Sequence, residues 1–327
     1  MTILTRRDVL ISTGAAGLSL GLAGPTRAAS AYPDKNISFV VPYGPGGGFD
    51  TFARAISPAM ERYLPNPVDI IPLNVPTGGG GKALIDMQRE RPDGYTIGVF
   101  PIPGALILQE RQNGRRFNLY DFSWIGSIGP GDTYAMGVRT ESPIQSVADM
   151  QELSKTREVS FTSTGLDGTS YMATVIACHL LGINAKQIIG YGGSADYIVG
   201  AIRGDADAVI AANSSLRRYQ GEGGIRIIAT FENESTLPGV PDAPALGQPE
   251  LAQITIERMV AGPPGLPADI RTLLTDALDR AVRDPEVVSW AQSVGVPWAP
   301  NPPGQADRVF REQAAFFDKW KTVLTDS

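Results

Sequence analysis

Hydrophobic residues follow two alternating patterns along most of this chain. Short runs rich in β-branched and aromatic residues, typical of strands, are separated by longer segments with apolar residues every three or four positions, typical of helices. Strands are predicted over residues 37–41, 68–73, 96–99, 135–138, 159–161, 208–210 and 225–229. Helices are predicted over 49–63, 82–88, 146–154, 170–181, 195–203, 268–283, 285–294 and 303–324. This alternation predicts an α/β fold with mostly parallel sheets covered by helices.

Two glycine-rich loops, residues 43–50 and 77–81, each follow a predicted strand and precede a predicted helix. Such a loop leaves backbone N–H groups unpaired at the positive end of a helix, which favours binding of an anion. Two loops of this kind in neighbouring units of one sheet are expected to face each other across a crevice. The pattern therefore indicates a site for something small and negatively charged.

A third loop, residues 163–170, offers hydroxyl groups and free N–H groups before a helix, and a fourth loop of this type begins at Tyr191. Both suit a carboxylate or a phosphate. A structural alternative exists for every one of these loops. The glycines can serve only as tight turns, the hydroxyls can serve as helix N-caps, and Asp50 can simply complement the first turn of its helix.

Turn-rich breaks at residues 127–132 and 238–249 divide the chain. They predict two chain crossings, near 132–138 and 254–260, between a discontinuous first lobe and a continuous second lobe. The first lobe is predicted to consist of residues 32–131 and 255–327, and the second lobe of residues 132–254. A ligand is expected between the lobes, outside the carboxyl ends of the strands.

Composition and charge exclude some partners. The 327 residues are 43% hydrophobic and 19% charged, which is ordinary for a globular protein, and the net charge is −6. Residues 1–31 carry three arginines and one aspartate, or +2, so subtraction leaves about −8 for the remainder. An acidic body argues against nucleic acid as a partner. Local backbone dipoles must therefore hold an anionic ligand.

The N-terminus, residues 1–31, is predicted to be a signal peptide that is cleaved near Ala31, and the mature chain is expected in the periplasm. Arg6 and Arg7 favour the twin-arginine route, while a general secretory signal that happens to carry two arginines is the alternative. Cys178, the only cysteine, can form no intramolecular disulfide, and none stands near the signal to carry a lipid. A freely diffusing monomer is expected.

Motifs for catalysis, cofactors and metals are weak. The first glycine loop lacks the last glycine of a dinucleotide fingerprint, and Ala83 stands where a phosphate loop needs a hydroxyl. His179, the only histidine, adjoins Cys178, and neighbours on a helix point about 100° apart. One His and one Cys cannot build a transition-metal site. No catalytic residue, metal or cofactor is therefore predicted, and the chain is not expected to be an enzyme.

Several motifs in a specific order carry a family resemblance. They are YPDKNI (32–37), VPYGPGGGFD (41–50), RPDGYT (91–96), STG (163–165), YGG (191–193), GDAD (204–207) and LPGVPDAP (237–244). With them the chain resembles the periplasmic solute-binding proteins of tripartite tricarboxylate transporters, also called the Bordetella uptake gene family. The resemblance covers nearly all of the chain after the predicted signal.

The resemblance implies a Venus-flytrap protein, a two-lobed periplasmic-binding-protein fold of type II-like topology with crossing hinge strands. It implies that backbone groups and waters from loops of both lobes hold a small organic carboxylate, and that the protein docks on integral-membrane permease subunits. Carried over by position, the ligand-binding residues are Tyr43, Gly46, Gly47, Gly48, Asp50, Gly78, Gly79, Gly80, Ser163, Thr164, Gly165, Thr169 and Tyr191.

Three residues depart from the family pattern. Phe49 replaces a frequent Thr or Ser, Tyr171 stands near a common His, and Gly192 replaces a common Lys. These changes argue against the usual family ligand and leave room for a less highly charged or more apolar acid. Two other functions remain open at this point: a ligand sensor for a membrane signalling protein, and a periplasmic enzyme.

Overall fold

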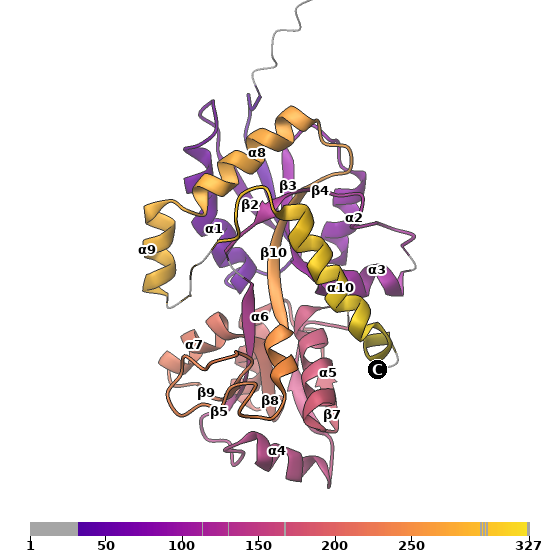
Figure 1. Cartoon of the computed structure of the whole chain (residues 1–327), viewed down its shortest axis with the longest axis vertical. Helices are drawn as coiled ribbons and strands as arrows, with labels where there is room; N and C mark the ends of the chain where they lie inside the picture. Colours follow the sequence, from indigo (N-terminus) through magenta and orange to yellow (C-terminus); the bar gives the residue numbers. More distant parts are fainter. Residues whose placement is uncertain are drawn as a thin grey trace, which may run out of the picture. The chain divides into compact units, whose positions relative to one another are not determined.

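Alternating strands and helices build a single ten-stranded mixed sheet (Figure 1). The computed structural model describes residues 32–325 except 113, 130, 167, 295, 297 and 299, so the predicted signal peptide and its cleavage site lie outside the described residues. The strand order is β2-β1-β3-β10-β5-β8-β6-β7, with β4 paired to β10 and β9 paired to β5. The strands are β1 (Ile37–Val41), β2 (Ile70–Asn74), β3 (Thr96–Ile102), β4 (Ser123–Ser127), β5 (Asp132–Arg139), β6 (Val159–Thr162), β7 (Ala185–Ile188), β8 (Ala208–Ala212), β9 (Ile225–Thr230) and β10 (Thr255–Gly262).

The first lobe is built on β1 to β4 and β10. In it β1 pairs in parallel with β2 and β3, whereas β10 runs antiparallel to β3 and β4. The apolar residues of β3, β4 and β10 are buried because helices cover the sheet, whereas Ile71 and Leu73 of the edge strand β2 are exposed. The helices of this lobe are α1 (Gly48–Glu61), α2 (Gly81–Arg89), α3 (Gly104–Arg111), α8 (Ala268–Ala281), α9 (Pro285–Ser293) and α10 (Ala306–Thr325).

The second lobe is built on β5 to β9. Here β6 pairs in parallel with β7 and β8, and β5 runs antiparallel to β8 and β9. One face carries a core in which Ile198 of α6 and Leu216 of α7 pack on Val209 of β8. The helices are α4 (Val147–Ser154), α5 (Thr169–Leu181), α6 (Ser194–Arg203) and α7 (Asn213–Gly221), followed by the 3-10 helix η1 (Pro249–Gln253).

Strands β5 and β10 join the two lobes, and Figure 1 shows β10 passing from one to the other. Their pairing is short, because it consists of Thr255 opposite Thr133 and Ile256 opposite Asp132. The two lobes therefore share one sheet through a narrow antiparallel connection. The fold class predicted from the family resemblance, an α/β fold of two lobes with crossing strands, agrees with this arrangement.

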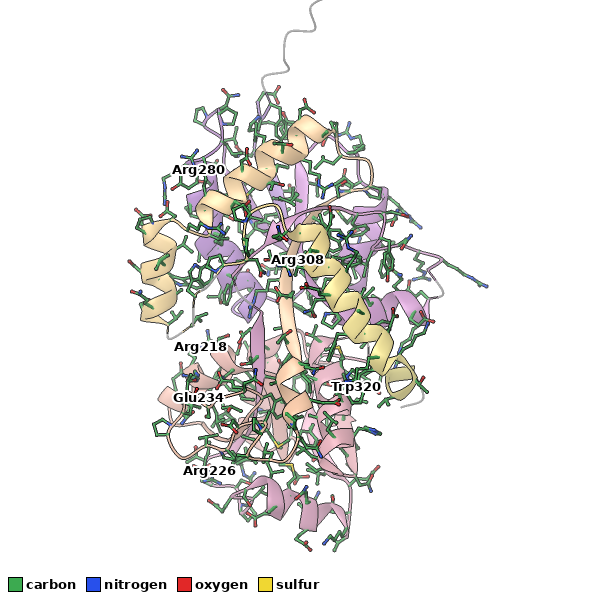
Figure 2. All side chains as sticks on the ribbon, viewed as in Figure 1. Arg218, Arg226, Glu234, Arg280, Arg308 and Trp320 are labelled. Carbon is green, nitrogen blue, oxygen red and sulfur yellow. The ribbon has the colours of Figure 1, made fainter. Side chains whose placement is uncertain are left out.

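The C-terminal helix α10 touches both lobes, since it packs on α3 and on α5. Trp320 lies near the end of this helix (Figure 2). Its ring centre is 6.0 Å from that of His179 on α5. Among the helices in the described part of the chain, none has both the length and the apolar character that a membrane crossing requires.

The sheet is mixed and not mostly parallel as the alternation predicts. The parallel pairs lie within one lobe each, β1 with β2 and β3, and β6 with β7 and β8, but the crossing strands β5 and β10 run antiparallel to every strand with which they pair. Strands β4 and β7 and helices α3 and α7 had no prediction. Helix α7 is too polar to show a periodic apolar face, and β4 is buried almost throughout, so its sequence does not alternate.

Glu257 on β10 is a buried acid whose carboxyl group lacks a full set of hydrogen-bond partners. Its side chain is 7% exposed, and its Oε2 has no hydrogen-bond partner among the described residues. Burial raises the pKa of Glu257 to about 7; Arg258 acts against this rise, and Glu312 and Asp132 add to it. At neutral pH the charged form is therefore costly.

Glu257→Gln is expected to stabilise the protein near pH 8 and to have little effect near pH 4.5. Because the folded pKa of about 7 exceeds the usual value, the folded state binds more protons than the unfolded state between these values, and the free energy of unfolding falls as pH rises. A neutral side chain removes this pH dependence, which changes the free energy of unfolding by at most about 3 kcal/mol over this range. Urea unfolding across this range measures it, with the exposed Glu222→Gln as control. Parallel pH profiles for wild type and Glu257→Gln would contradict the assignment.

Candidate binding cleft

A small cavity lies where loops of both lobes meet. Its lining consists of Tyr43, Gly47, Gly48, Phe49, Tyr134, Thr164, Thr169, Ser170, Ser194, Tyr197, Ala212, Ser215, Ile256 and Arg258. Aromatic rings and hydroxyl groups thus form most of its wall. The volume is about 30 Å³, which is room for about two water molecules.

The N-termini of four helices converge on this cavity. Their N-caps are Gly47 of α1, Gly168 of α5, Gly193 of α6 and Ala212 of α7. Glycine and alanine have no polar side chain, so none of these caps can occupy the N–H groups of its own first turn. The lining therefore combines several free backbone donors with the positive ends of helix dipoles, an arrangement that favours an anion.

Two hydrogen bonds link the first glycine loop to the second lobe. The N–H of Gly44 donates to the carbonyl oxygen of Gly192 at 3.0 Å, and the N–H of Gly48 donates to Oγ of Ser194 at 3.0 Å. A hydroxyl of one lobe thus takes the place that an acceptor atom of a ligand could occupy at the start of α1. These contacts close the cleft in this structure.

Asp50 holds the first loop in shape and is not among the residues that line the cavity. Its carboxylate accepts hydrogen bonds from the N–H of Gly46 at 2.9 Å, from Asn74 at 3.0 Å and from Arg54 at 3.0 Å. Burial raises the pKa of Asp50, but the hydrogen bonds from Arg54, Gly46 and Asn74 outweigh it and leave the pKa below its ordinary value. The charged carboxylate therefore fixes Gly46, which also lies outside the lining.

The second glycine loop, residues 77–81, packs against Pro42, directly before the first glycine loop, and does not line the cavity. Gly78, Gly79 and Gly80 all have positive φ, of 64°, 63° and 96°, and none of them lines the cavity. A Cβ on Gly80 would lie 2.8 Å from Cβ and 2.9 Å from the carbonyl oxygen of Pro42. The absence of a side chain lets this loop pack against the strand end that carries the first loop, so the prediction that the two loops face each other across a crevice is wrong.

The second lobe contributes Thr164 and Thr169 to the lining from the predicted set. The hydroxyl of Thr164 lies 3.2 Å from that of Ser170, which connects the loop to the first turn of α5. Ser163, Gly165 and Tyr191 lie outside the lining. Ser163 is fully buried and its Oγ has no partner among the described residues, and Tyr191 donates its hydroxyl proton to Asp205 at 2.8 Å.

Sequence reasoning did not select Arg258, the only charged side chain among the described residues that line the cavity. It is 2% exposed, and its Nη2 donates to Asp132 Oδ2 at 2.9 Å. Its guanidinium carbon lies 3.9 Å from the ring centre of Phe52 and 5.6 Å from that of Phe49, an arrangement of the cation–π kind. One signal could have revealed it: Glu257 and Arg258 interrupt an otherwise apolar strand.

The one cysteine and the one histidine form no reactive pair. Cys178 is buried in the core of the second lobe, and burial raises the pKa of its thiol to about 12, so it stays protonated. His179 is exposed on α5. Within residues 32–325, apart from the six undescribed positions, no group of His, Cys, Asp and Glu is arranged to hold a metal ion.

Comparison with known proteins assigns the chain to a family. The model of the tripartite tricarboxylate transporter family receptor (TctC) matches residues 52–325. The chain belongs to this family. A UPF0065 protein of Bordetella bronchiseptica is 26% identical over 305 residues, which are 92% of this chain and 89% of the relative.

Two solved structures have the same fold as this TctC-family chain. The periplasmic binding protein BugD is 20% identical, covers 88% of this chain and 98% of its own, and has a TM-score of 0.77. MatC from Rhodopseudomonas palustris with bound malate is 20% identical, and the match covers 90% of this chain and 100% of the MatC chain, with a TM-score of 0.78. The two-lobed periplasmic-binding-protein fold is thereby established for this chain.

Gly80→Ala is expected to destabilise the protein more than Gly78→Ala. Both positions require positive φ, which costs an alanine about 1 kcal/mol. Only Gly80 also lacks space, because its Cβ would meet Pro42 at 2.8 Å, whereas nothing lies within 4 Å of a Cβ on Gly78. The difference between the two variants, measured by urea unfolding, isolates the packing of one loop on the other. Equal losses of stability would show that the second loop does not support the first.

Proposed function

We propose that this chain is a periplasmic receptor that captures a small organic carboxylate between its lobes and delivers it to the integral-membrane permease subunits of a tripartite tricarboxylate-type transporter. Membership of the TctC family supports the receptor role. The presence of malate in MatC, which shares the fold, supports a carboxylate as ligand. Export with cleavage of residues 1–31 near Ala31 and a monomeric state are parts of the same proposal.

The observation that carries the proposal is the convergence of four helix N-termini without polar N-caps on one cavity. Each N-terminus contributes roughly half a positive charge, so together they compensate a carboxylate without an array of cationic side chains. The N–H groups of Gly48 and Ser214 already have acceptors in Ser194 and Asp132, so a ligand would meet the other first-turn donors or replace these acceptors. The acidic body of the protein cannot attract such a ligand from a distance. Recognition then depends on local geometry.

A ligand needs the lobes to separate. A cavity of about 30 Å³ holds water molecules but no organic acid, so the links from Gly44 to Gly192 and from Gly48 to Ser194 must open first. We place the hinge at residues 132–138 and 254–260, with residues 32–131 and 255–327 moving as one lobe and residues 132–254 as the other. Strands β5 and β10 share only a short pairing in this region, which supports that placement.

Direct ligand contacts are proposed for the predicted residues that line the cavity, namely Tyr43, Gly47, Gly48, Thr164 and Thr169. Supporting roles are proposed for the other predicted residues, namely Gly46, Asp50, Gly78, Gly79, Gly80, Ser163, Gly165 and Tyr191. Phe49 adds an aromatic wall whose ring centre lies 5.1 Å from that of Tyr43. The aromatic share of the lining favours an acid whose carbon skeleton packs on rings.

Gly48→Ala is expected to abolish most binding without loss of stability. A Cβ on Gly48 would lie 3.5 Å from Oγ of Ser215 and 3.7 Å from Nη2 of Arg258, so the folded protein accommodates it, but it projects into the cavity. Affinity should fall at least about tenfold, equivalent to about 1.4 kcal/mol. Thermal-shift and calorimetric titration with malate, succinate, citrate and benzoate measure this.

Gly221→Ala is the matched control, because it makes the same change at the far end of α7, where nothing lies within 4 Å of a Cβ. It should bind like wild type. If Gly48→Ala kept wild-type affinity, the site would lie elsewhere. If none of the four acids bound wild type, the carboxylate proposal would be contradicted for this set.

A further inference from the structure

The guanidinium of Arg258 has more donors than partners. An arginine side chain has five N–H donors, yet the only hydrogen bond of this group to a described residue joins Nη2 to Asp132. Its Nε is inaccessible to solvent and has no partner among the described residues. Because unsatisfied donors of a buried cation are costly, the group is poised to accept a further anionic partner.

The surroundings of Arg258 show where that partner would lie. A Cβ built on Gly48 lies 3.7 Å from Nη2 of Arg258, 3.5 Å from Oγ of Ser215 and 4.0 Å from Oγ of Ser194. Nη2 of Arg258 therefore lies beside the first turn of α1, and the hydroxyls of Ser194 and Ser215 lie beside the same glycine. A carboxylate placed here would meet a full positive charge, hydroxyl donors and a helix N-terminus together.

If Arg258 had a purely structural role, Asp132 would be the only hydrogen-bond acceptor for its guanidinium. That pair joins β5 to β10, but Asp132 also accepts hydrogen bonds from the hydroxyl and the backbone N–H of Ser214, so its carboxylate is shared among three donors. Phe52 covers one face of the guanidinium at 3.9 Å and provides no acceptor. The pair with Asp132 thus accounts for the burial of the charge and leaves the remaining donors unexplained.

We propose that Arg258 is the charge-selecting residue of the receptor: it forms a direct ion pair with an anionic group of the bound solute and so favours an acid over its neutral amide. This assignment rests on the proposed function, since it concerns the same cleft. An amide in this position would lose the ion pair and would turn N–H donors toward the donors of Arg258. The helix N-termini would then favour an anion in general, and Arg258 would add most of the discrimination between an acid and its amide.

The test compares acids with amides in wild type and in Arg258→Met. Malate, succinate, citrate and benzoate are each titrated into the protein. For each acid, the amide in which every carboxylate is replaced by a carboxamide is titrated in parallel. The wild type should prefer the acid by at least about thirtyfold, and Arg258→Met should reduce that preference by at least about tenfold, the size expected for a charge-assisted pair. Arg258→Lys keeps the positive charge but loses the planar guanidinium with its paired donors, so its preference for the acid should lie between those of wild type and Arg258→Met.

Two further variants separate selection from stability. Asp132→Asn leaves the charge of Arg258 in place and should keep or increase the preference for the acid. The double variant Asp132→Asn/Arg258→Met removes both charges of the buried pair, leaves neither ion unpaired, and should show the same reduction of the preference even if Arg258→Met alone fails to fold.

Affinities for acid and amide that fall in parallel, with an unchanged ratio in the Arg258 variants, would show a structural role only and overturn the assignment. In that case the proposed function would stand, because the acids would still bind. If no acid bound wild type, the proposed function would fail and this assignment with it.

Discussion

A buried ion pair connects the two strands that run between the lobes. Arg258 of β10 and Asp132 of β5 meet at 2.9 Å where these strands share only two opposed residue pairs. Burying each charge alone would cost several kcal/mol, and the pair, together with the ring of Phe52, offsets that cost. The same contact fixes a positive charge beside the cavity, so the joint between the lobes and the chemistry of the cleft depend on one side chain.

The convergence of helix N-termini follows from the topology. Helices α1, α5, α6 and α7 follow strands β1, β6, β7 and β8 directly along the chain. Within the second lobe, β6, β7 and β8 run parallel, so the helices after them begin at the same edge of the sheet. The first lobe brings the start of α1 to that edge, where Gly48 meets Ser194. An anion site at this place is therefore a consequence of the fold, and N-caps without a polar side chain leave it available to a ligand.

Sequence reasoning reached the local elements well and the contacts between them less well. The strand over residues 37–41 and the glycine loop after it were predictable because β-branched residues, glycines and an amphipathic helix follow one another within a short segment. The role of Gly80 was not, since it depends on Pro42 approaching from another strand end. Arg258 was not selected either, because β10 is buried on both faces, shows no alternation and gains its meaning from loops distant in sequence.

The central claim is that the backbone at four converging helix N-termini binds the carboxylate. Amide shifts of deuterated, ¹⁵N-labelled protein, recorded while the tightest-binding of the four acids is added to saturation, test it most directly. The largest changes should fall on the first turns, at Gly48, Thr169 and Ser194, with smaller changes at Gly78 and Gly79 in the supporting loop. Changes concentrated away from the starts of α1, α5, α6 and α7 would contradict the claim.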